Sequence, residues 1–177
     1  VPSDGQWQQD FDRVGKAISD AAQHLADGEQ LEAHESLEAI REILLVSRRR
    51  NDMDYYLDHL TEFHDTMEEI VLAVKVEQPS ELSQDTIKQV ETLAGKAVEQ
   101  WKQVKSSPFK PDRFGFDAKK LAKRQQLLQA ETEALEKLQQ ALAAKDKAQI
   151  VKTGTAIKPL FAQSFMLFGA FPNPPKK

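Results

Sequence analysis

The sequence contains no cysteine, few glycines and prolines, and no long apolar run. Without cysteine, the chain cannot form disulfides, thiolate zinc sites, iron–sulfur clusters or the Cys-x-x-Cys-His attachment of covalent haem. No apolar run reaches the roughly 20 residues that cross a bilayer, so we expect a soluble protein with no membrane span. Glycine-rich phosphate loops, nucleophile elbows and His-Glu-x-x-His motifs are also missing. An enzyme is not excluded, but nothing in the sequence argues for one.

Composition predicts an all-helical protein. Of the 177 residues 40% are hydrophobic and 29% are charged, and Leu, Ala, Glu, Gln and Lys outweigh the β-branched residues. The length favours one domain, residues 1–177, with a substantial core. The net charge of -4 is mild and its signs are interleaved, which argues against nucleic-acid binding.

The chain begins with VPSDGQW and has no initiator methionine. A secreted protein whose signal peptide had been removed would begin in this way, and we therefore expect a periplasmic location. A chain cleaved from an affinity tag would look the same.

Apolar residues at steps of three and four define six helical segments. The first carries the stripe Trp7, Phe11, Val14, Ile18 and Leu25. The others span about 29–49, 53–75, 83–105, 117–144 and 147–169. We expect an up-and-down antiparallel helical bundle with a four-helix core and one or two accessory helices. An irregular loop is predicted at about 106–116, and a loose tail at 170–177.

A faint internal repeat supports antiparallel hairpins at both ends of the chain. Residues 25–41 align with residues 142–158, although any two amphipathic hairpins with a short polar turn would align similarly. The second copy has Val151 and Thr155 where the first has His34 and Glu38. This polar pair is therefore not a packing requirement of the pattern.

Two of the four histidines precede a glutamate by four residues: His34 precedes Glu38, and His64 precedes Glu68. Residues four apart share one helix face. If the second and third segments form a hairpin that bends near residue 50, His34 faces Glu68 and His64 faces Glu38. Imidazole and carboxylate ligands suit zinc, iron, copper or manganese. We therefore predict a transition-metal site for binding, delivery or sensing, with His34 and His64 within about 5 Å of each other and His59 as a fifth ligand.

Other interpretations of these pairs remain open. A histidine and a glutamate four residues apart often form a solvated pair worth a few tenths of a kcal/mol, and two facing helices can hold a buried His–Glu hydrogen bond without a metal. His59 could equally be a surface residue, and Arg41 could neutralise Glu38.

The segment PLFAQSFMLFGAF, residues 159–171, is apolar almost all round. Such a helix is either central in a core or docks on another surface. The alternative function is therefore an interaction module without metal that forms a homodimer or binds a protein partner. Its predicted interface residues are Phe161, Phe165, Met166 and Phe168.

The hairpin pattern resembles the helical-bundle cytochromes, namely the cytochrome c prime group and its b-type relatives. The resemblance covers most of the chain but includes no specific motif. In that family the c-type attachment motif belongs in the last helix, where this chain reads TGTAIKPLFAQSF with neither cysteine nor histidine. The b-type relatives need a methionine in the first helix and a histidine in the last, and this chain has neither. The resemblance therefore implies a shared scaffold without the haem.

Overall fold

The structure is a computed structural model that describes residues 5–169. Within this range the chain is all-α and contains no strand, as the composition predicts. The helices are α1 (Gln6–Asp27), α2 (Gln30–Arg50), α3 (Tyr56–Ala73), α4 (Gln84–Ser106), α5 (Ala118–Ala143) and α6 (Lys147–Met166). Two short 3-10 helices, η1 (Pro79–Glu81) and η2 (Pro111–Phe114), lie in the connections before and after α4.

The chain divides into two compact units, residues 1–61 and residues 62–177. The sequence predicts a single domain over residues 1–177. The division falls inside α3, whose first turns belong to the first unit. Each unit has its own packing.

The first unit is built around a hairpin of α1 and α2. Gly28 ends α1 with a left-handed φ of 81°, which glycine adopts at little cost. Across this turn His24 Nδ1 lies 2.6 Å from Glu29 Oε2, and this hydrogen bond raises the pKa of His24. At the other end of the hairpin, Arg50 donates to the buried Asp10 at 2.5 Å and lowers the pKa of that carboxyl.

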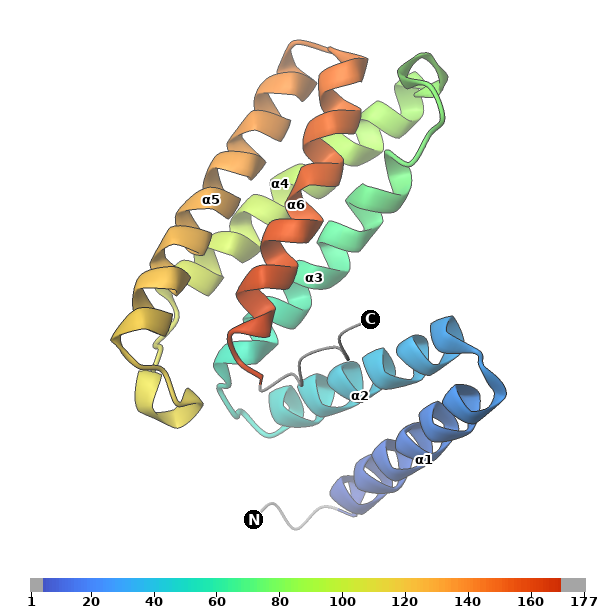
Figure 1. The fold of residues 1–177 in the computed structure, drawn as a ribbon, viewed down its shortest axis with the longest axis vertical. Helices are drawn as coiled ribbons and strands as arrows, with labels where there is room; N and C mark the ends of the chain where they lie inside the picture. Colours follow the sequence, from blue (N-terminus) through green and yellow to red (C-terminus); the bar gives the residue numbers. More distant parts are fainter. Residues whose placement is uncertain (1–4, 170–177) are drawn as a thin grey trace, which may run out of the picture. The chain divides into compact units, whose positions relative to one another are not determined.

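The second unit is an up-and-down four-helix bundle. Figure 1 shows α3, α4, α5 and α6 side by side, with consecutive helices running in opposite directions. Side-chain caps fix where three helices begin: Ser83 for α4, Asp117 for α5 and Asp146 for α6 each accept a backbone N–H of the first turn. Such caps satisfy donors that have no partner inside the helix.

Aromatic side chains join the helices of the bundle at one level. The Phe63 ring on α3 lies 4.7 Å from Trp101 on α4 and 5.7 Å from Phe161 on α6. Trp101 Nε1 also donates to Thr132 Oγ1 on α5 at 3.1 Å. This level therefore links all four helices and fixes their register.

The connection between α4 and α5 is irregular, as predicted. It carries Phe109, Phe114 and Phe116, whose rings pack with Phe168 just after α6. This aromatic cluster lies at one end of the second unit. The predicted loose tail at 170–177 lies outside the described residues.

Candidate functional site

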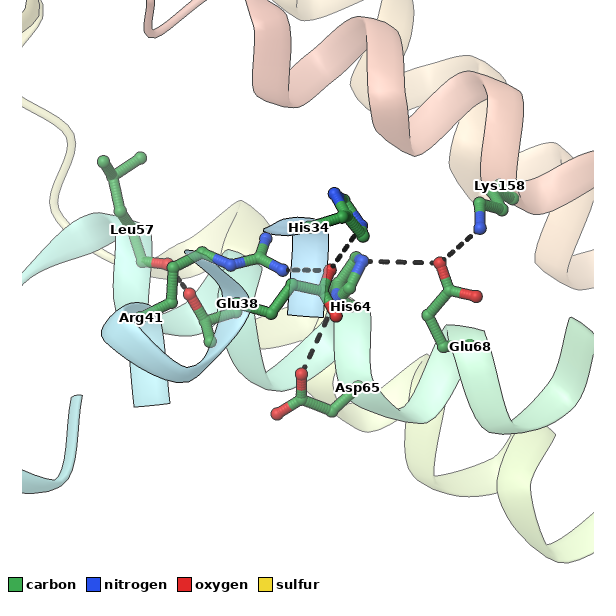
Figure 2. Close-up of polar contacts among 9 residues, drawn as sticks. His34, Glu38, Arg41, Leu57, His64, Asp65, Glu68 and Lys158 are labelled. Atoms are coloured by element: carbon green, nitrogen blue, oxygen red, sulfur yellow. Dashed lines mark hydrogen bonds and ion pairs between the residues drawn. The ribbon is translucent and has the colours of Figure 1, made fainter. Parts of the chain in front are cut away.

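The first predicted pair, His34 and Glu38, lies on the surface of α2. His34 Nε2 is 3.2 Å from Glu38 Oε1, and the histidine side chain is largely exposed. The same carboxylate oxygen accepts a hydrogen bond from Arg41 at 2.6 Å (Figure 2). Glu38 is thus paired with a guanidinium one turn along its own helix, as the alternative interpretation allows.

The second pair, His64 and Glu68, lies on α3 in the second unit. His64 is buried, and its ring lies 5.3 Å from that of Phe161. Its Nε2 is 3.4 Å from Glu68 Oε1, and its Nδ1 is 3.5 Å from Asp65 Oδ1. Lys158 on α6 lies 2.7 Å from the same Glu68 oxygen (Figure 2). A lysine therefore compensates the charge of this carboxylate.

His59, the predicted fifth ligand, lies in the first unit near the start of α3. Its Nε2 is 3.6 Å from Asp54 Oδ1. It borders a concave surface of about 420 Å³ that also includes Asp58. Arg48 forms a two-pronged ion pair with Asp58, so this carboxylate too is matched by a basic side chain.

Basic side chains already pair with both glutamates of the predicted metal site. A transition metal would have to compete with Arg41 and Lys158 for the two glutamates. Within residues 5–169 no three His, Asp or Glu side chains cluster closely enough to hold an ion. The four predicted ligands are divided between the two units, so the shared metal site stays a prediction.

The four predicted interface residues near the C-terminus differ in exposure. Phe161 is 3% exposed and packs inside the bundle. Phe165 stacks on Phe161 and is half-buried, and Phe168 belongs to the aromatic cluster. Met166 is exposed. The three phenylalanines thus pack within the second unit, as a central core helix would, and Met166 is the only exposed residue of the four.

The second unit also contains a buried carboxyl, that of Glu131, which is not among the site residues predicted from the sequence. Glu131 on α5 has no exposed surface, and neither of its oxygens has a hydrogen-bond partner within the described chain. Burial raises its pKa to about 8. The sequence does carry the signal, because Glu131 lies three residues after Leu128 and four before Leu135, which is a core position.

Glu131 is the neighbour in sequence of Thr132, which accepts the hydrogen bond from Trp101. It therefore lies at the level where the aromatic side chains join the four helices. The other three helices also carry buried polar atoms without a partner in the described structure: Thr66 Oγ1, Gln100 Oε1 and Ser164 Oγ. Gln100 precedes Trp101, and Ser164 lies about one turn from Phe161. Unpaired polar groups of this kind lower stability.

A surface groove of about 580 Å³ follows α5 and α6. Alanines and exposed polar side chains line it, including Lys137 and Lys152, and its lining contains no histidine. A smaller groove of about 230 Å³ shares Lys137 with it. This surface offers no arrangement of groups that favours a reaction.

Part of the apolar stripe predicted on α1 is exposed in the structure. Phe11, Ile18 and Leu25 are 53%, 54% and 59% exposed. On α2, the apolar spacing of Leu37, Ile40 and Leu44 predicts that Leu37 is buried, but it is 48% exposed. That expectation was wrong because the helices meet through smaller side chains: the buried apolar residues of the hairpin are Ala17, Ala21, Ala33 and Ile43.

No protein-family model, curated protein or solved structure matches the chain. The resemblance to the helical-bundle cytochromes therefore stays a prediction, as does the periplasmic location. No helix in residues 5–169 combines the length and the hydropathy needed to cross a bilayer.

Proposed function

We propose that this chain is a helical interaction protein whose α1 face binds a partner helix. One observation carries the proposal: Phe11, Ile18 and Leu25, seven residues apart, form a line along α1 and are each more than half exposed. A seven-residue repeat is the spacing by which helices pack lengthwise on one another. This face narrows the possible partners to an amphipathic helix with an apolar stripe of its own.

The two surfaces of α1 that flank its contact with α2 carry different kinds of side chain. On one side lie Phe11, Ile18 and Leu25, and on the other lie the exposed Arg13 and Lys16. Lys16 pairs with Asp20 at 2.5 Å on the charged side. A helix that served only to cover α2 would be expected to be polar on both sides. The apolar side is therefore suited to contact with a further helix.

More than half of the surface of each of Phe11, Ile18 and Leu25 adds nothing to the stability of the hairpin itself, because it faces solvent. Complete burial of one such side chain is worth about 1.5–3 kcal/mol. Covering the exposed half of three of them would therefore add about 2–4 kcal/mol. This is a substantial gain for a two-helix unit with an alanine-rich interface, and a docked helix would supply it.

Replacing the line with polar helix formers tests the proposal. We expect the triple variant Phe11→Gln, Ile18→Gln, Leu25→Gln to keep the helical circular dichroism and urea midpoint of the wild type in dilute solution, because these side chains face solvent in the single chain. Ala21→Gln is the matched control, since it places a long polar side chain in the hairpin interface and should lower hairpin stability. A triple variant that loses its hairpin helicity would show that the chain needs this face for its own fold, and the proposal would fail.

A further inference from the structure

We infer that the helix that covers the α1 face is α1 of a second copy of this chain. The inference rests on the proposed function and adds the identity of the partner. Three properties of the face favour self-association: the spacing of its large side chains, the small residues beside them, and the absence of charge along the line itself.

The spacing is symmetric about Ile18. Phe11 lies seven residues before it and Leu25 seven residues after it. When two such helices pack antiparallel with Ile18 against Ile18, Phe11 of each chain lies level with Leu25 of the other. Both ends of the contact then pair one large apolar side chain with another.

Small residues lie beside the large ones and leave room for a close approach. Gly15, Ser19, Ala22 and Ala26 are exposed on the side of the line away from α2. A Cβ added at Gly15 would meet no atom within 4 Å. A helix with glycine at an interior position is less stable than one with alanine there. The space that Gly15 leaves can, however, accept a side chain of a neighbouring helix.

The line of large side chains and the small residues beside it carry no charge. Asp12 lies at the edge of this face, one heptad before Ser19, and accepts a hydrogen bond from Gln8. Arg13, Lys16 and Asp20 lie on the opposite side of the helix. Two copies can therefore meet along the line without desolvating a charge or bringing like charges together.

The size of the face predicts a weak complex. With 22 residues, α1 is about 33 Å long, and a helix is about 10–12 Å wide. The contact then covers about 400 Å² on each copy, half of the about 800 Å² per partner in a stable interface. We therefore expect a reversible dimer whose population depends on protein concentration.

The absence of cysteine allows a direct test in the full chain. In the Ile18→Cys variant the only thiols of two packed copies would meet at the centre of the contact. We expect mild oxidation at high protein concentration to yield a disulfide-linked dimer. The matched variant is Lys16→Cys, whose thiol lies on the charged side of the same helix. It should yield at least tenfold less disulfide-linked dimer.

Sedimentation equilibrium provides an independent readout. The mass of the wild type should rise from monomer towards dimer with concentration, Ile18→Glu should weaken association at least tenfold, and Lys16→Glu should leave it unchanged. A wild type that stays monomeric at submillimolar concentration, with no excess of cross-linked Ile18→Cys dimer, would overturn the second copy as partner. The proposed function fails separately, through loss of hairpin helicity in the triple glutamine variant.

Discussion

Glu131 illustrates how one side chain can make a bundle depend on pH. The carboxyl lies among core residues of the second unit without a hydrogen-bond partner in the described chain. Burial disfavours its charged form, which is the cause of its raised pKa. The neutral acid is therefore the form compatible with the packed bundle.

The Glu131→Gln variant should lose this pH dependence. An unfolded glutamate ionises near 4.5, whereas the folded Glu131 keeps its proton up to about 8. Unfolding thus releases a proton between these pH values, and stability falls as pH rises by at most about 1.4 kcal/mol per pH unit. We expect the unfolding free energy of Glu131→Gln, measured in urea, to decline less than that of the wild type across this window.

Glu133→Gln is the control, because Glu133 is exposed two residues further along α5. This variant should follow the pH dependence of the wild type. Parallel pH curves for the wild type and Glu131→Gln would show that Glu131 ionises normally in the folded chain.

At the residue scale the sequence predicts local pairs better than distant ones. The distances within His34–Glu38 and His64–Glu68 follow from helix periodicity alone. The contact between Lys158 and Glu68 joins two helices 90 residues apart and requires the register of α6 against α3. Sequence spacing carries no information on that register, so the charge that competes with a metal at Glu68 could not be foreseen.

At the scale of elements, α6 approaches the end of α3 closely. A Cβ on Gly154 would lie 3.0 Å from Val74 Cγ2 and 3.2 Å from Val74 Cγ1. Gly95 on α4 would meet nothing within 4 Å. The two helical glycines therefore differ in whether the surrounding structure requires them.

Matched substitutions at these glycines test the packing of α6. Gly95→Ala should raise the unfolding free energy by about 0.5–1 kcal/mol through helix propensity. Gly154→Ala should gain less, because the buried Val74 must shift. Gly154→Val should lower stability by about 1–3 kcal/mol relative to Gly95→Val, since it overpacks the contact. Equal effects of valine at both positions in urea unfolding would contradict the close approach.

The helices themselves were largely predictable. Periodicity predicted α2, α4 and α5 to within one residue at each end, and the α1–α2 and α5–α6 hairpins are present. Proline disfavours a helix interior, yet α6 begins at Lys147, contains Pro159 and continues past it to Met166. Periodicity identifies an apolar face and not what covers it. For this reason the stripe on α1 was recognised from the sequence, while its exposure was not.

At the scale of the whole molecule, the two units differ in how much they bury. The four-helix unit encloses large side chains such as Trp101, Phe63 and Met67, whereas the hairpin of the first unit packs mainly through alanines. A hairpin of two helices with so little apolar burial between them is expected to be marginally stable alone. Association through α1 would stabilise it, which links the fold of the first unit to the proposed function.

Hydrogen exchange of the backbone amides of α1 tests this account most directly, because it needs no substitution. In dilute solution we expect α1 amides to exchange much faster than those of α5, and to slow markedly at submillimolar concentration while α5 stays unchanged. Protection of α1 that equals that of α5 in dilute solution, and does not vary with concentration, would contradict the account.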